Sequence, residues 1–273
     1  MNVLVYSNPE YSIEDDYYFL KLFKDYDNSE LIINFSYEDP HSPELKKLNE
    51  YFDLNNVIGE GSELNKLASL KRWVVENISS KGKNLTNRLY DDLDCIEIIN
   101  QSKKDGYSLN CRYISYIFMQ LLLALGFKAR WVMCLPMDLR DDECHCVTEV
   151  YSKELEKWIV IDAAFDLFYF NKKGIPMNLA EMRKMLIEEN KLKFLSPNKE
   201  YSYFIQNYWK KNIFRFKYLI NNKYNALASS QIEFACLNPD NFVLKNKEFI
   251  LNGKTNILNY YYNETMFYKG EKV

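Results

Sequence analysis

The run from Cys111 to Leu125 constrains the fold most, because it is apolar on nearly every face of a helix. Its strongly polar members are Arg112, Ser115 and Gln120. Such a run is too long for an ordinary strand and predicts a helix that is buried all round. Gly126 can supply the left-handed residue that ends it. The rest of the chain must therefore pack around a central helix.

Cys111 is the first residue of this predicted helix. Unpaired backbone N–H groups and the positive end of the helix dipole favour an anion at a helix N-terminus. That environment lowers the pKa of a thiol and yields the thiolate, which is the nucleophilic form. A lone cysteine there is more often structural, since free cysteines are commonly buried, so the position needs support from other residues.

Composition excludes several classes of protein. The 273 residues, with 22 Tyr and 17 Phe, allow one large domain with a substantial core. A net charge of −3 gives no basic footprint for nucleic acid or an anionic membrane. The longest apolar run is too short for a membrane span, and residues 1–6 lack the basic start of a signal peptide. We therefore expect a cytoplasmic protein whose six cysteines are thiols, without nucleic-acid or membrane partners.

The segment before the central helix predicts two further helices. Ser62 can cap the first, in which apolar residues recur at helical spacing as far as Ile78. Asp91 or Asp92 can cap the second, and a polar loop, residues 101–110, leads from it to the central helix. The cysteine helix is thus expected to be the third and most buried of a series.

We expect three parts in the chain. Residues 1–60 form an N-terminal segment with candidate strands at 3–6 and 31–35, and residues 61–172 form the core. Residues 173–273 form a helix plus a β-rich extension packed on the core.

The C-terminal part has its own local signals. Asn178 opens a capping box, which predicts a helix to about Glu189. Aromatic residues alternate with basic ones from Phe214 to Tyr218, which indicates a strand, and residues 242–251 can form a hairpin.

After Gly126 the composition changes to a β type, which predicts strands at 127–134, 145–151 and 157–162. The last two are close enough to form a hairpin. A four-residue loop at 152–155 would place Val147 opposite Val160 and His145 directly opposite Asp162. Opposed residues share one face with side chains a few ångströms apart, so this histidine and carboxylate are expected to be neighbours.

A thiol nucleophile needs a base, and the base needs an orienting acceptor. Cys111, His145 and Asp162 supply these three groups in that order. The segments that carry them resemble the transglutaminase-like superfamily over roughly residues 62–165. The matching segments are Asn110-Cys111-Arg112 with Leu125-Gly126-Phe127-Lys128-Ala129-Arg130-Trp131-Val132, His145-Cys146-Val147-Thr148-Glu149-Val150-Tyr151, and Lys157-Trp158-Ile159-Val160-Ile161-Asp162.

The resemblance implies an α+β, papain-like core in which the cysteine helix packs on an antiparallel sheet. It implies that Cys111 is the nucleophile, that His145 is the general base and then acid, and that Asp162 orients the imidazole. The sequence departs from the family at Val147, where a tryptophan is frequent, and at Ala163, where a proline is frequent.

The implied reaction is acyl transfer through a thioester, without a cofactor. The substrate would be a protein or peptide that contains glutamine or another amide, with hydrolysis favoured over transfer to an amine. A non-catalytic peptide-binding module is the alternative. An arylamine N-acetyltransferase fits less well, because no glycine-rich stretch precedes Cys111.

Two metal interpretations compete with this one. One is a zinc site, since cysteine and histidine, the usual zinc ligands, occur at Cys144, His145 and Cys146, with Cys134 upstream. In a strand, however, Cys144 and Cys146 share one face while His145 points to the other. The acidic stretch 138–143 lacks the ligand spacing of a calcium loop. Neither pattern predicts a metal site.

Overall fold

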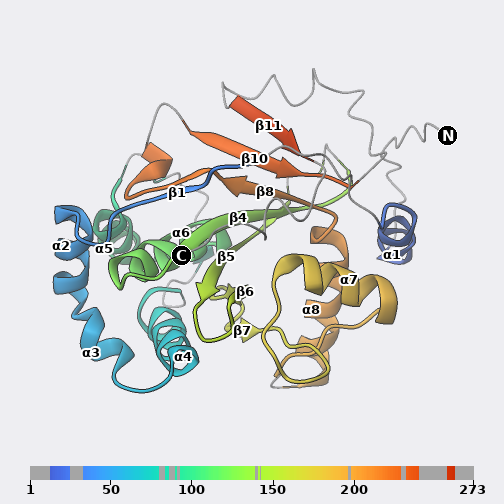
Figure 1. The fold of residues 1–273 in the computed structure, drawn as a ribbon, viewed down its shortest axis with the longest axis horizontal. Coiled ribbons are helices and arrows are strands. Elements are labelled where there is room, and N and C mark those ends of the chain that lie inside the picture. The colour runs from blue at the N-terminus through green and yellow to red at the C-terminus, as the bar shows by residue number, and fades with distance from the viewer. Residues whose placement is uncertain are drawn as a thin grey trace.

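The computed structural model describes residues 13–24, 33–79, 84–85, 90, 93–138, 141, 143–195, 198–228, 232–239 and 257–261. At the centre of these residues is a seven-stranded sheet with the order β11-β10-β8-β4-β5-β6-β7 (Figure 1). Neighbouring strands are antiparallel except β10 and β11. The strands are β4 (Ala129–Leu135), β5 (His145–Ser152), β6 (Lys157–Asp162), β7 (Leu167–Phe168), β8 (Arg215–Leu219), β10 (Glu233–Leu237) and β11 (Ile257–Tyr261).

Helices cover both faces of this sheet, with α2–α6 on one side and α1, α7 and α8 on the other (Figure 1). They are α1 (Ile13–Leu22), α2 (Pro43–Phe52), α3 (Leu54–Ile58), α4 (Glu63–Val74), α5 (Cys95–Asp105), α6 (Cys111–Ala124), α7 (Leu179–Glu189) and α8 (Lys199–Asn212). A π-helical turn, Val75–Ser79, extends α4, and a 3-10 turn spans Ala226–Ala228. Two short parallel pairs complete the fold: β1 (Ser36–Tyr37) with β9 (Asn221–Asn222), and β2 (Asn84–Leu85) with β3 (Tyr107–Ser108).

The alternation of side chains along the strands produces two apolar clusters. Cys146 and Val150 of β5 belong to the cluster under α6, whereas Val147 belongs to the cluster under α7 and α8. The same alternation holds in β6, where Ile159 and Ile161 face α6 while Val160 faces the other way. This is a mixed α+β architecture, and the cysteine helix packs on antiparallel strands as expected.

The central helix confirms the prediction made from the apolar run. Residues 113–124 of α6 are all buried, and the side chain of Asn110 caps its first turn by accepting from the Tyr113 N–H. Gly126 follows the helix with a φ of 79°, in the left-handed region. The buried Gln120 is held because its Nε2 donates to the Lys223 carbonyl at 3.0 Å.

The helix before α6 differs from its prediction. Its cap is Asp94, and Asp94 with Glu97 forms a full capping box; Asp91 and Asp92 lie outside the described residues. The helix continues to Asp105, where the left-handed Gly106 ends it, so the first half of the predicted loop is helical. The reciprocal bonds of the capping box fix the start more strongly than one aspartate could.

Other predictions have mixed outcomes. The structure confirms Ser62 as the cap of α4, the capping box that opens α7, and the strand predicted around Phe216. Residues 33–35 have no regular structure, and β1 begins directly after them. The strand predicted at 3–6 and the hairpin at 242–251 lie outside the described residues. No helix of the described part of the chain is long and apolar enough to cross a membrane.

Candidate active site

Hydrogen bonds fix the first turn of α6 to the sheet. The Ser115 hydroxyl donates to the Cys111 carbonyl at 2.6 Å and accepts from the indole N–H of Trp131 at 2.7 Å. The Thr148 hydroxyl donates to the Ser115 carbonyl at 2.7 Å. Since Trp131 is on β4 and Thr148 is on β5, both strands hold the turn that carries Cys111.

The β5–β6 hairpin brings His145 and Asp162 together in a register that differs from the predicted one. The loop has four residues, but it spans 153–156, so Val160 lies opposite Glu149 rather than Val147. His145 is therefore displaced by two residues from the position opposite Asp162. An even displacement keeps both side chains on one face, and a diagonal pair remains within reach of long side chains.

The shift has a local cause in the turn. β5 continues through Ser152, whose hydroxyl accepts from the Leu155 N–H at 3.1 Å. Glu156 takes a left-handed φ of 51° and returns the chain to β6.

Asp162 is a buried acceptor for three groups. Its Oδ2 lies 2.8 Å from His145 Nε2 and accepts from the Tyr169 hydroxyl at 3.0 Å. Its Oδ1 accepts from the Phe165 N–H at 3.1 Å. His145 and Asp162 are both 0% exposed. A carboxylate held in this way fixes the orientation of the imidazole.

Aromatic rings enclose His145 on the side of the sheet away from α6. Phe165 stacks on the imidazole with ring centres 4.6 Å apart, and Tyr208 and Trp209 of α8 meet it edge-on at 5.3 and 5.2 Å. The Trp209 indole N–H donates to the Tyr169 hydroxyl at 2.5 Å and thereby orders the donor to Asp162. These four residues were not predicted, because no local pattern links them to a histidine so far away in sequence.

Tyr169→Phe is expected to destabilise the protein by about 1–3 kcal/mol, because it removes a donor to a buried carboxylate and leaves the Trp209 indole N–H without its acceptor. Urea unfolding followed by circular dichroism measures this cost. Tyr203→Phe is the control, because Tyr203 is a tyrosine of α8 that is 71% exposed. Equal stability of the two variants would contradict a structural role for the Tyr169 hydroxyl.

Cys111 and His145 shift each other's pKa. A hydrogen bond with the Cys146 thiol contributes most to holding the pKa of Cys111 well below its usual range; the bond and charge of His145 add to it, and burial opposes both. Burial acts to lower the pKa of His145, but the charge and hydrogen bond of Asp162, together with those of Cys111, raise it to about 10. The pair therefore favours a thiolate beside an imidazolium.

One ring nitrogen of His145 remains available. Nε2 is engaged by Asp162. Nδ1 is buried and forms no hydrogen bond of normal geometry with any group in the described part of the chain. The interaction of His145 with Cys111 that shifts both pKa values is therefore not an aligned hydrogen bond at Nδ1. Catalytic hydrogen bonds are often loose without substrate, so this geometry is compatible with proton transfer at Nδ1.

The cysteines near His145 are divided between the two faces. Cys146 and Cys144 contact the cluster under α6, while Cys134 lies in the cluster on the other face. Among the described residues, no three His, Cys, Asp or Glu side chains are grouped so that they could hold a metal ion. The spacing of the Cys-His-Cys segment is thus explained by strand alternation.

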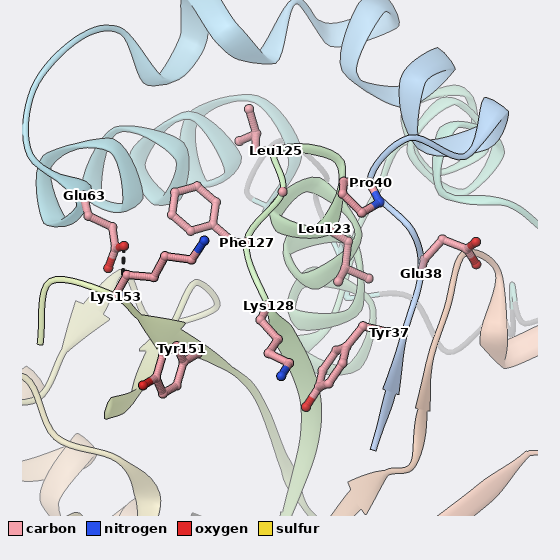
Figure 2. A pocket seen from close by; sticks show the side chains of 11 residues that line it. Tyr37, Glu38, Pro40, Glu63, Leu123, Leu125, Phe127, Lys128, Tyr151 and Lys153 are labelled. Atoms are coloured by element: carbon pink, nitrogen blue, oxygen red, sulfur yellow. Dashed lines mark hydrogen bonds between the residues drawn. The ribbon is translucent and has the colours of Figure 1, made fainter. Parts of the chain in front are cut away.

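A separate cavity of about 390 Å³ lies at the opposite end of α6 (Figure 2). Leu123, Leu125 and Phe127 give it an apolar lining, and Lys128 and Lys153 add two amino groups. None of the three predicted site residues lines it.

Part of the chain is similar to a known protein family. The model of the transglutaminase-like superfamily matches residues 53–163, a segment that contains all three predicted site residues. Among solved structures, a candidate cysteine protease from Cytophaga hutchinsonii is 18% identical, with a TM-score of 0.34. That alignment covers 48% of this chain and 40% of the other, so the chain spans under half of that protein. No curated protein matches the chain. Residues 53–163 are therefore similar to the transglutaminase-like superfamily, and the mixed α+β architecture of the described residues is consistent with a papain-like fold.

Proposed function

We propose that this protein is a cysteine enzyme that transfers acyl groups through a thioester on Cys111, and that it hydrolyses peptide or amide bonds. The observation that carries the proposal is the buried hydrogen bond between His145 and Asp162, beside a cysteine at the start of the central helix. Cys111 is partly buried.

In the proposed reaction the Cys111 thiolate attacks the carbonyl carbon, and the His145 imidazolium donates its proton to the leaving amine. Asp162 holds the ring through Nε2, so the proton moves at Nδ1. The backbone N–H of Cys111 lies at the helix start, where it can donate to the oxyanion. Water, activated by the now neutral His145, then releases the acid. An amine in place of water would give transfer.

The proposed substrate is a protein or peptide that contains glutamine or another amide, and the proposed compartment is the cytoplasm. All six cysteines are free thiols, which fits a reducing environment.

Mass spectrometry of the protein with a mixture of glutamine-containing peptides, with and without a primary amine, tests the proposal. We expect an acyl adduct on Cys111 and cleaved or deamidated peptides, with amine-linked products only if transfer competes. Protein alkylated beforehand at Cys111 is the control. If fresh and alkylated protein give the same products, the proposal is wrong.

The complete burial of His145 favours a second candidate, a non-catalytic peptide-binding module. In that case Phe165, Tyr208 and Trp209 would make the imidazole a structural residue. Peptides would then bind without an adduct, and their affinity would survive alkylation of Cys111.

A further inference from the structure

Three thiols gather where α6 begins. Cys144 and Cys146 are two residues apart at the start of β5, so their side chains point to the face that α6 covers. Cys146 is buried there, and Cys111 and Cys144 pack against the same cluster. The Cys111 sulfur lies 3.8 Å from the Cys144 carbonyl oxygen.

Cys146 connects the other two thiols. Its interaction with Cys111 and Cys144 acts to lower the pKa of each of these thiols and raises the pKa of Cys146 itself. Acyl transfer needs one cysteine, so Cys146 and Cys144 have no part in the proposed reaction. Cys146 is thus a second thiol near the nucleophile, and it can react with an oxidised form of Cys111.

We propose that Cys146 captures an oxidised Cys111 as an intramolecular disulfide, with a peroxide as the oxidant, and that this reversibly blocks the site. The proposal rests on the proposed function only in taking Cys111 to be the reactive thiol. It assigns Cys146 as the resolving residue because Cys146 is a β5 residue buried on the face that α6 covers, in the cluster against which Cys111 packs.

The chemistry balances in two steps. The Cys111 thiolate attacks one peroxide oxygen, the O–O bond breaks, and Cys111 becomes a sulfenic acid while hydroxide takes up a proton as water. The Cys146 sulfur then attacks the Cys111 sulfur, the S–O bond breaks, and a second water leaves with the proton of Cys146. Two thiols are oxidised by two electrons, and one hydrogen peroxide is reduced to two waters.

The two cysteines lie at one contact between a helix and a strand. A disulfide needs Cβ atoms about 3.5–4.5 Å apart. α6 packs directly on β5, and the Cys111 sulfur lies 3.8 Å from the carbonyl oxygen of Cys144, two residues before Cys146, so closure is a local change of the two side chains. Capture protects Cys111 from the irreversible sulfinic and sulfonic states, and a thiol reductant restores it.

The test treats reduced full-length protein with equimolar hydrogen peroxide and maps linked peptides by mass spectrometry. We expect a Cys111–Cys146 disulfide that dithiothreitol reverses and that prevents alkylation of Cys111. Because Cys144 lies in the same peptide as Cys146, variants assign the partner. Cys146→Ser should form at least about tenfold less of this disulfide and accumulate over-oxidised Cys111, whereas Cys144→Ser and Cys134→Ser should behave like the native protein.

Two results would overturn the proposal. Native protein could proceed to sulfinic acid without a disulfide, or Cys146→Ser could keep the full yield, which would make Cys144 the partner. Cys146→Ala serves as a second variant if the serine is poorly tolerated in the core, with circular dichroism as the check on folding. Failure here is distinct from failure of the enzyme proposal, because selective alkylation of reduced Cys111 would still be observed.

Discussion

Cys111→Ala and His145→Ala are each expected to abolish turnover, with losses of at least about 1,000-fold, while leaving the fold intact. The first removes the nucleophile and the second removes the group that carries its proton. Folding should survive His145→Ala, because Asp162 keeps the Tyr169 hydroxyl and the Phe165 N–H as donors. Asp162→Asn should cost less, since it disturbs the orientation of the ring and does not remove the proton carrier.

Alkylation of Cys111 measures the same pairing without a known substrate. In the native protein the thiolate persists below the reference cysteine pKa of about 8.5, and labelling falls only as the pH drops through the lowered pKa of Cys111. His145 loses its imidazolium proton as the pH rises through its pKa of about 10. At pH 6.5 a thiol of reference pKa is about 1% thiolate, so His145→Ala should slow labelling by about 10- to 100-fold, the lower value reflecting the bond with Cys146 that remains.

His41→Ala is the matched control, because His41 is the other histidine of the chain and lies exposed in a loop. It should label at the native rate at every pH. If His145→Ala labels as fast as this control at pH 6.5, the imidazole does not activate the thiol. If all three site variants unfold, these residues are structural and the binding-module proposal gains.

The central helix and the hairpin could be predicted because their signals are local. The apolar run predicted α6, and the even period of a strand kept His145 and Asp162 on one face although the register was shifted by two residues. The cap of α5 differs from the prediction because the reciprocal Asp94–Glu97 pair fixes the helix start more strongly than a single earlier aspartate.

The surroundings of His145 depend on long-range packing. Trp209 reaches the site because α8 crosses the face of the sheet opposite α6, and its aromatic residues had no pattern that distinguished them from other core residues. The position of β8 between β4 and β10 likewise joins strands that are far apart in sequence. Strand order of this kind follows from the total burial of the sheet faces, which no short segment encodes.

Glu149→Ala is expected to lower the free energy of unfolding by about 3–5 kcal/mol, because it leaves the buried guanidinium of Arg130 without its carboxylate. The two residues are directly opposed in β4 and β5, and both side chains are 0% exposed. Arg130 donates to Glu149 Oε2 through Nε at 3.1 Å and Nη2 at 2.7 Å, and its guanidinium lies 4.1 Å from the ring centre of Trp158. The other oxygen of Glu149 accepts from the Leu179 N–H and so anchors the start of α7.

Urea unfolding at 25 °C measures this loss, with Lys184→Met as the control. Lys184 forms an exposed pair with Glu188 at 3.9 Å, and removing it should change stability by no more than about 0.5 kcal/mol. The double variant Arg130→Met/Glu149→Leu should be more stable than Glu149→Ala, because it removes both buried charges and keeps apolar volume between Trp158 and its neighbours. A double variant less stable than Glu149→Ala would show that the ion pair contributes net stability, and that Arg130 and Glu149 hold β5, and with it His145, by charge rather than by packing.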